Sequence, residues 1–188
     1  NVIRKYVKED GYLFFLGNTD PKKNTPRVLR AYAAHLKQSE SKRQLLIADL
    51  KEDFLDSILK TEGIEDIKPH LAFPGYIENK DLADLYNGAF AFLYPSLRES
   101  FGIPMLEAMA CGAPVIAGNT SAMPEIVGEK ALLVDPFKDE EITDKLLELE
   151  TSPTLRQEQI EYGLERVKLF SWRHTAEELL KIYQSIKK

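Results

Sequence analysis

Residues 89–118, AFAFLYPSLRESFGIPMLEAMACGAPVIAG, place a helical segment between two short apolar runs. The runs AFAFLYP (89–95) and PVIAG (114–118) are typical of buried strands, and the helix between them is expected to end near Cys111 and Gly112. Parallel neighbouring strands need a crossover of this kind, and strands buried on both faces are almost continuously hydrophobic. The stretch therefore predicts a strand–helix–strand unit of a parallel sheet.

The same alternation continues on both sides of this stretch. Further strands are expected at 12–17, 44–49, 70–75 and 131–135. Helices are expected at 25–37, 52–61, 79–88 and 121–128, and throughout the chain after Lys138. Thr25 is the expected N-cap of its helix, with Pro26 at the first helical position. Together these elements predict one α/β domain over residues 1–188, a parallel sheet of about six strands with helices on both faces. The helices from about Pro153 onward are expected to pack on its side or on a partner.

Composition sets limits on the partners. The 188 residues are 44% hydrophobic and carry a formal net charge of −5, which argues against nucleic acid or an anionic membrane surface as the main partner. The single cysteine, Cys111, permits no internal disulfide and fits a reducing compartment. No apolar run is long enough for a transmembrane segment. The chain begins with Asn1 rather than Met, so we expect it to be a piece of a longer protein.

Polar loops follow four of the expected strands, at residues 17–24, 75–80, 95–102 and 118–125. Ligands of open parallel sheets bind beyond the carboxyl ends of the strands, so these loops predict a single cleft. The helix that follows Glu99 is capped by Ser100 or by Gly102, and the sequence leaves both open. Its first N–H groups and its dipole favour an anion such as phosphate. Neither the dinucleotide-binding fingerprint nor the P-loop is present.

Glu99 and Glu107 stand eight residues apart, one before this helix and one inside it. A carboxylate accepts hydrogen bonds from two hydroxyls at once, so it suits a sugar or ribose diol and repels phosphate. A ligand with hydroxyls at both ends and a diphosphate between them is a nucleotide sugar. We therefore interpret the pair as the two ends of a nucleotide-sugar site. No Cys or His pair has metal-ligand spacing, so no metal is expected.

The stretch ESFGIPMLEAMACGAPVIA followed by PEIVG closely resembles the C-terminal domain of family four retaining glycosyltransferases, which have the two-domain GT-B architecture. Glu99 and Glu107 match the E-x(7)-E motif of that family. The resemblance extends to FLGNTDPKKN, FPGYIENKDLADLY, LLVDP and FSW (170–172), in the order of the family. It implies a Rossmann-like donor-binding domain. It also implies transfer of a hexose from a GDP- or UDP-linked donor with retention, without a metal or other cofactor.

The resemblance also assigns roles to individual residues. Glu99 would contact the donor sugar and Glu107 the ribose, while Lys23 would neutralise the diphosphate. The first loop would contribute Gly17 and Asn18 to the donor site. The other expected donor contacts are the backbone amides of Phe101, Gly102 and Ile103, with Tyr76 and Ile77 against the base.

The whole enzyme would also need an N-terminal acceptor domain, which this chain lacks, so the chain alone is expected to be inactive. The resemblance implies a mannosyltransferase of polysaccharide or glycan biosynthesis in the cytoplasm. Contact with the inner face of the membrane would then be made by the full-length enzyme.

Asn18 is a departure from the family, because many members carry an arginine at this position as a second phosphate clamp. Lys23 would then carry more of the charge, with Lys22 as a helper. Two alternatives stay open at this stage: a sucrose- or glycogen-synthase-like donor domain, and a degenerate module that binds a nucleotide or a partner without catalysis. Tyr76 and Ile77 have a further alternative role, which is to pack the end of a strand.

Overall fold

A computed structural model describes residues 2–186. Its centre is one parallel sheet of six strands, as the sequence predicts, and the strand order is β3-β2-β1-β4-β5-β6. The strands are β1 (Tyr12–Leu16), β2 (Leu45–Ala48), β3 (Leu71–Gly75), β4 (Ala89–Tyr94), β5 (Val115–Gly118) and β6 (Leu132–Val134). Each boundary lies within two residues of the expected one.

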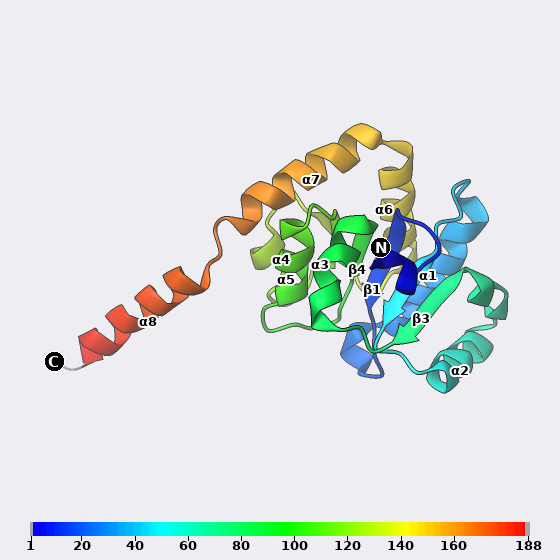
Figure 1. Ribbon diagram of the computed structural model, residues 1–188, viewed down its shortest axis with the longest axis horizontal. Coiled ribbons are helices and arrows are strands. Elements are labelled where there is room, and N and C mark those ends of the chain that lie inside the picture. The colour runs from blue at the N-terminus through cyan, green and yellow to red at the C-terminus, as the bar shows by residue number, and fades with distance from the viewer. Residues whose placement is uncertain (1, 187–188) are drawn as a thin grey trace.

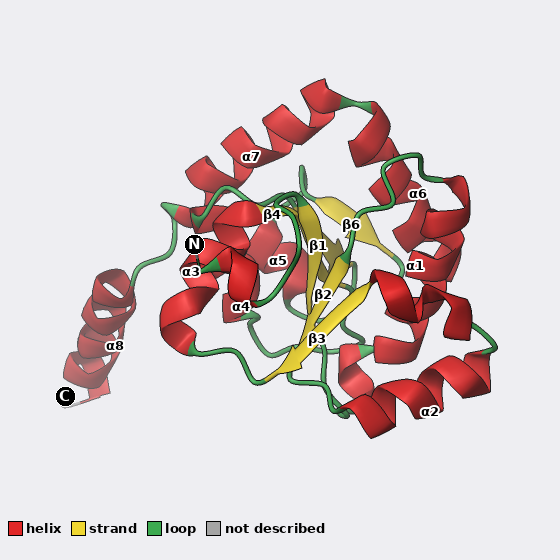
Figure 2. Cartoon of the chain, turned by 45° about the vertical axis from the view of Figure 1, so that its right-hand side comes forward, coloured by secondary structure: helices red, strands yellow, loops and turns green. Residues whose placement is uncertain are grey.

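Helices cover both faces of the sheet (Figure 2). One face carries α1 (Thr25–Gln38), α2 (Glu52–Glu62) and α6 (Asp139–Thr151). The other carries α3 (Asn79–Gly88), α4 (Ile103–Ala110) and α5 (Met123–Val127). This three-layer arrangement confirms the α/β class.

Alternation along the strands separates the two cores. On β1, Leu13 and Phe15 pack with the α1 layer, whereas Tyr12 and Phe14 pack with the α3 layer. Successive strand side chains point to opposite faces, so a strand between two helical layers must be apolar at every position. This requirement explains why the strand runs in the sequence show no polar alternation.

The chain reverses its direction of travel across the sheet between β1 and β4. From β1 it moves outward through β2 to β3, and it then returns to β4 on the other side of β1. The loops that leave the carboxyl ends of β1 and β4 therefore diverge and open a crevice between them, which is the usual ligand position in such sheets. The loops 17–24 and 95–102 lie at this crevice.

The structure settles where two helices begin. The cap of α1 differs from the expected residue, and the cap of α4 is one of the two residues that the sequence left open. Asn24, not Thr25, is the N-cap of α1, and it has the left-handed φ of 63°. Thr25 is the first helical residue, and its hydroxyl donates to the carbonyl oxygen of Asn18 at 3.0 Å instead of accepting from the helix. Gly102 precedes α4 with a φ of 92°, which decides between the two caps because only glycine adopts that conformation readily.

Three short 3-10 helices were not predicted: η1 (Ile3–Lys5), η2 (Pro21–Lys23) and η3 (Glu65–His70). Of these, η2 matters most for the site because it carries Lys23 at its last position. Asp20 precedes it and accepts from the backbone N–H of Lys22 at 3.0 Å, which fixes the turn.

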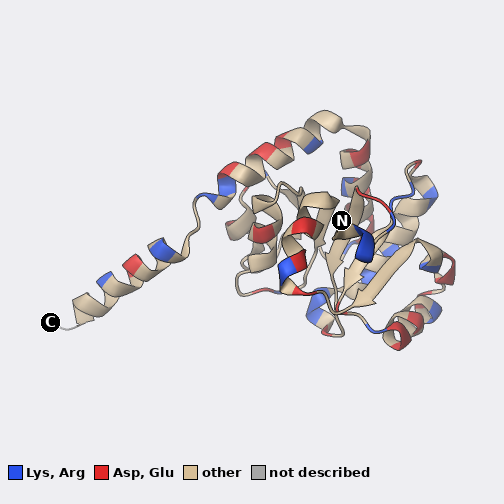
Figure 3. Ribbon diagram, in the orientation of Figure 1, with Lys and Arg blue, Asp and Glu red and all other residues tan. Residues whose placement is uncertain are grey.

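The C-terminal helices behave differently from each other. α7 (Pro153–Val167) packs beside α4 and α6, which confirms the expected packing for this helix. α8 (Trp172–Ile186) extends away from the sheet, and all of its side chains are exposed (Figure 1). Both helices carry acidic as well as basic side chains (Figure 3). No helix among residues 2–186 combines the length and hydrophobicity that crossing a bilayer requires.

Candidate functional site

Backbone and hydroxyl hydrogen bonds tie three of the four predicted loops together. The N–H of Leu97 donates to the carbonyl oxygen of Lys22 at 2.8 Å, which joins the loop after β4 to the loop after β1. From the loop after β5, the hydroxyl of Thr120 donates to the Leu97 carbonyl at 3.1 Å, and Ser121 donates to the Glu99 carbonyl at 2.6 Å. Residues far apart in the chain thus form one rim at the carboxyl edge of the sheet.

The side chain of Asn24 connects two of the segments that border this rim. Its side-chain amide is buried and donates to the carbonyl oxygens of Pro95 at 3.0 Å and Pro136 at 2.6 Å. The left-handed backbone of Asn24 turns the chain from η2 into α1, so the same residue orients Lys23 and binds two neighbouring loops.

Replacing Asn24 by alanine is expected to lower the free energy of unfolding by about 2–4 kcal/mol. The change removes the donor of two buried carbonyl oxygens, and alanine tolerates the left-handed backbone less well than asparagine does. Asn24→Gly is the matched variant, because it loses the amide but tolerates the backbone angle, and we expect it to be about 1 kcal/mol milder. Urea unfolding of the three proteins measures both values. Equal losses of unfolding free energy in the two variants would show that the left-handed backbone of residue 24 does not contribute to the destabilisation.

The centre of the rim is an ion pair between two of the predicted site residues. The Nζ of Lys23 lies 2.7 Å from Oε1 of Glu99 and 3.0 Å from the hydroxyl oxygen of Tyr94. The side chains of Lys23 and Glu99 are only 15% and 11% exposed. A pair so far withdrawn from water is stabilised only when its geometry and hydrogen bonds are good, which is the case here.

The surroundings of Glu99 keep it ionised. Burial alone would raise the pKa of this carboxyl, but the hydrogen bond and the charge of Lys23 lower it below its usual value. The neighbouring hydroxyls of Tyr94 and Ser96 lower the pKa of Glu99 further. Burial, followed by the charge of Glu99, raises the pKa of Tyr94, so its phenol keeps its proton at neutral pH. The site therefore presents a fixed carboxylate, an ammonium and a phenol side by side.

Glu107 lies on α4, and its side chain is exposed at the surface. Its Oε2 accepts a hydrogen bond from the hydroxyl of Tyr86 at 3.2 Å. The remaining acceptor capacity of the carboxylate faces solvent, so it is available to the hydroxyls of a ligand.

The segment between the two glutamates presents backbone and apolar side chains. Gly102 is buried, whereas Phe101 and Ile103 on either side of it are 42% and 44% exposed. Gly17, at the end of β1, is buried against the ring of Phe15, where a Cβ would clash at 2.4 Å.

An apolar groove of about 500 Å³ continues from Phe101 and Ile103 past Glu107 to residues 167–175. Phe170 closes part of it, with its ring 6.0 Å from that of Phe101 in an edge-to-face arrangement. The groove extends the candidate site beyond the polar loops.

Tyr76 and Ile77, the two residues expected against the base, differ in their exposure to solvent. Tyr76 is 72% exposed beyond β3, while Ile77 is buried in the hydrophobic core, which matches the alternative role of packing the end of a strand.

Asn18 accepts from the N–H of Asp20 at 2.9 Å, so its side chain serves the turn. Lys22 lies 3.6 Å from Asp20 and is 45% exposed. Lys23 is thus the cation that this loop directs into the rim.

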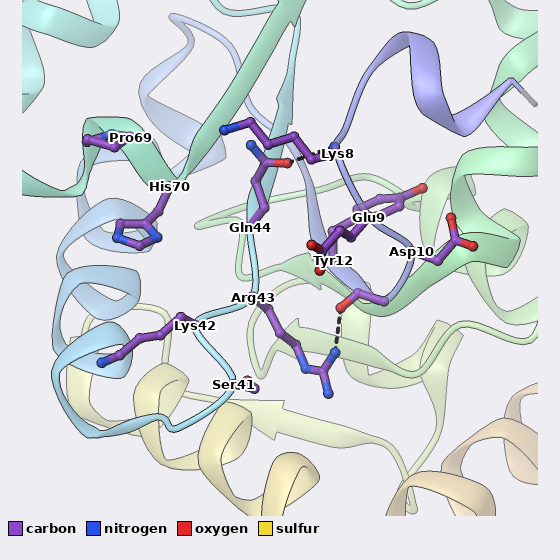
Figure 4. A pocket seen from close by; sticks show the side chains of 11 residues that line it. Lys8, Glu9, Asp10, Tyr12, Ser41, Lys42, Arg43, Gln44, Pro69 and His70 are labelled. Carbon is purple, nitrogen blue, oxygen red and sulfur yellow. Dashed lines mark hydrogen bonds between the residues drawn. The ribbon is translucent and has the colours of Figure 1, made fainter.

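A second hollow lies at the opposite edge of the sheet, before β1, β2 and β3 (Figure 4). It measures about 200 Å³, and Lys8, Arg43 and His70 line it together with Glu9 and Asp10. Arg43 donates to the carbonyl oxygen of Gly11 at 2.8 Å, so its charge serves the local structure. Within residues 2–186, no three His, Cys, Asp or Glu side chains form a group that could hold a metal ion.

Comparison with known proteins decides the family to which this fold belongs. The sequence profile of the family described as "Glycosyl transferases group 1" matches residues 3–166. The chain belongs to this family. The glycosyltransferase chain is also 30% identical over 187 residues to O-antigen chain mannosyltransferase B of Escherichia coli. The matched region covers 97% of this chain and 48% of that protein. Sucrose-phosphate synthase of Spinacia oleracea is 30% identical over 173 residues, or 84% of this chain and 16% of the synthase.

Solved structures agree with this assignment. Sucrose-phosphate synthase from Thermosynechococcus elongatus superposes with a TM-score of 0.80 at 24% identity, over 98% of this chain and 47% of that chain. The C-terminal domain of a group 1 glycosyl transferase (LpcC) from Francisella tularensis superposes with a TM-score of 0.74 at 25% identity, over 89% of each chain. The glycosyltransferase chain thus has the Rossmann-like fold of a GT-B domain, and it spans about half or less of the length of the curated relatives it matches.

Proposed function

We propose that this chain is the donor-binding domain of a retaining hexosyltransferase. The observation that carries the proposal is the nearly buried Lys23–Glu99 pair at the carboxyl edge of the sheet, next to the start of α4. A cation, a carboxylate and a helix N-terminus within one rim match the alternating charges of a nucleotide sugar.

Each group of the rim has a counterpart in such a ligand. The Lys23 ammonium and the first N–H groups of α4 would neutralise the diphosphate, and Glu99 would accept hydrogen bonds from the sugar hydroxyls. Glu107, on the exposed face of α4, would hold the ribose. Tyr76 stays a candidate for contact with the base because its ring is exposed.

The names of the relatives narrow the donor. Three relatives are named serotype-specific mannosyltransferase WbdA and one O-antigen chain mannosyltransferase B, so we infer a GDP- or UDP-linked hexose with mannose favoured. A role in polysaccharide or glycan synthesis follows from the same names. The sucrose-phosphate synthases among the relatives support the alternative of a sucrose-type donor domain.

The whole protein would add an N-terminal acceptor domain. This inference rests on the fact that the chain matches only 48% of the length of the E. coli relative. Domain closure excludes water and completes the catalytic groups, so the chain alone would bind nucleoside diphosphate weakly and transfer no sugar. We infer a cytoplasmic enzyme that would contact the inner face of the membrane through the full-length protein.

One observation favours the second candidate, a nucleotide-binding module without catalysis. Asn18 brings no positive charge to the rim, and Lys22 pairs with Asp20. A single lysine would then face the diphosphate. Titration with nucleoside diphosphates and assay of the whole protein separate the two candidates, since only the first predicts turnover.

Glu107→Ala is expected to weaken nucleoside diphosphate binding about tenfold or more. The change removes a charged acceptor from the ribose hydroxyls, and each such bond contributes on the order of 1.5–3 kcal/mol. With a 2′,3′-dideoxyribose ligand the difference between the variant and the wild type should nearly vanish. Glu129→Ala, on an exposed residue after α5, is the control and should bind both ligands normally. A penalty that persists with the dideoxy ligand would remove Glu107 from the ribose.

A further inference from the structure

The loop after β5 reaches the backbone of Glu99 through Ser121. The hydroxyl of Ser121 donates to the carbonyl oxygen of Glu99 at 2.6 Å. Ser121 has a φ of 59°, in the left-handed region that few residues other than glycine adopt. The residue is exposed, so packing in a core does not account for this conformation. A strained residue on an exposed loop points to a contact that the conformation serves.

This hydrogen bond fixes a stretch of backbone that is otherwise without one. Within residues 2–186, the Ser121 hydroxyl is the only hydrogen-bond partner of the backbone of residues 98–101. The carboxylate of Glu99 is held separately, by the ammonium of Lys23 at 2.7 Å. Glu99 is therefore anchored twice, by its side chain to the loop after β1 and by its carbonyl to the loop after β5.

The two loops can approach each other because residue 118 is a glycine. A Cβ on Gly118 would lie 2.8 Å from the carbonyl oxygen of Ser96, so any larger residue would push the loops apart. Two positions further on, the hydroxyl of Thr120 donates to the Leu97 carbonyl at 3.1 Å. The loop after β5 thus runs along the segment 95–102 and holds its carbonyl oxygens by consecutive hydroxyls.

We propose that Ser121 is a positioning residue that keeps the carboxylate of Glu99 aimed at the donor sugar when Lys23 turns to the diphosphate. This inference rests on the proposed function, because it requires that Glu99 meet the sugar. A diphosphate would draw the ammonium of Lys23 toward itself and weaken its hold on the carboxylate. The hydrogen bond from Ser121 involves no ligand, so it would persist in the bound state. A carboxylate that orients sugar hydroxyls is effective only when its own position is fixed.

The test combines turnover of the whole protein with nucleoside diphosphate affinity and urea unfolding. Turnover is followed as the release of GDP from GDP-mannose, or of UDP from UDP-glucose. Ser121→Ala removes the hydroxyl and keeps the left-handed strain, whereas Ser121→Gly removes the hydroxyl and relieves the strain. Thr61→Ala is the control, because it removes an exposed hydroxyl that donates to the Ser57 carbonyl at 2.8 Å on α2, outside the rim.

Both Ser121 variants are expected to lower kcat about tenfold with the diphosphate affinity unchanged, and Thr61→Ala to change neither. Ser121→Gly should nevertheless resist urea as well as the wild type does, because the relieved strain offsets the lost hydrogen bond. In the Glu99→Gln background, Ser121→Gly should cost little further turnover, because no charge remains to be positioned. A purely structural role of Ser121 would give neither of these two results.

Turnover of Ser121→Gly near that of the wild type would overturn the role of Ser121. A loss of rate that adds in full to that of Glu99→Gln, or that is matched by an equal loss of diphosphate affinity, would overturn it as well. These outcomes leave the proposed function intact, since that function depends on Glu99 and Lys23 themselves. Failure of the wild-type protein to bind GDP or UDP would contradict the proposed function, and the role of Ser121 with it.

Discussion

Replacing Glu99 by glutamine is expected to lower kcat of the whole protein by about 100-fold or more, with little loss of nucleoside diphosphate affinity. The magnitude is typical of removing one preorganised electrostatic group. A nucleoside diphosphate carries no donor sugar and would make little contact with Glu99, so its binding should be maintained. Because the substitution also releases Lys23 from its ion pair, we expect affinity for the diphosphate to be equal to that of the wild type or slightly higher.

The physical reason is the charge that develops during transfer. The donor sugar becomes positively charged as the diphosphate leaves with negative charge. Under the proposed function, Lys23 and the start of α4 would serve the leaving group, whereas the carboxylate of Glu99 would orient the sugar hydroxyls and offset the positive charge. A neutral amide retains the shape of Glu99 but not its charge.

Steady-state rates and nucleoside diphosphate affinity, measured side by side on the wild type and Glu99→Gln, decide the role of this residue. Glu129→Gln, on an exposed residue outside the rim, controls for the chemical change itself. Turnover near that of the wild type would exclude Glu99 from catalysis. A loss of affinity equal to the loss of rate would place Glu99 at the nucleotide instead.

Lys23→Ala is expected to weaken nucleoside diphosphate binding about 10- to 100-fold more than nucleoside binding. One ammonium facing a diphosphate in a partly desolvated site contributes on the order of 1–3 kcal/mol. The substitution also leaves Glu99 without its cation, so the pKa of this carboxyl should rise. Activity of the whole protein should therefore fall further as the pH is lowered.

Lys22→Ala is the control for this effect. Lys22 is the neighbouring lysine of the same turn, but it is 45% exposed and pairs with Asp20. We expect it to change the affinity little. Calorimetry with a nucleoside and its diphosphate gives both values for each variant, and equal losses for the two ligands in Lys23→Ala would exclude Lys23 as the phosphate clamp.

The sheet was predictable because its strands are buried on both faces. Runs such as those at 12–17 and 89–95 have to be apolar throughout, so they stand out from the amphipathic helices between them. The same regularity placed Glu99 and Lys23 at one edge, since the carboxyl ends of parallel strands point the same way. It did not show that the two side chains contact each other, because that depends on how η2 and the loop after β4 fold together.

The sequence around Asn24 and Tyr94 did not indicate that these two residues belong to the rim. The sequence favours Thr25 as the cap of α1, but the cap is Asn24, because asparagine is one of the few residues that tolerates a left-handed backbone. Tyr94 was interpreted as a core residue of its strand, which it also is. Its place directly before Pro95, at the end of the strand, was the only hint that its hydroxyl reaches the site.

The most direct test of the central claim is calorimetric titration of the 188-residue chain with GDP, UDP and the corresponding nucleosides. The proposed function predicts saturable binding of at least one diphosphate that is weakened by Lys23→Ala and by Glu107→Ala, and unaffected by Lys22→Ala. Absence of binding by the wild-type chain, or binding that none of these substitutions alters, would contradict a nucleotide-sugar site on this rim.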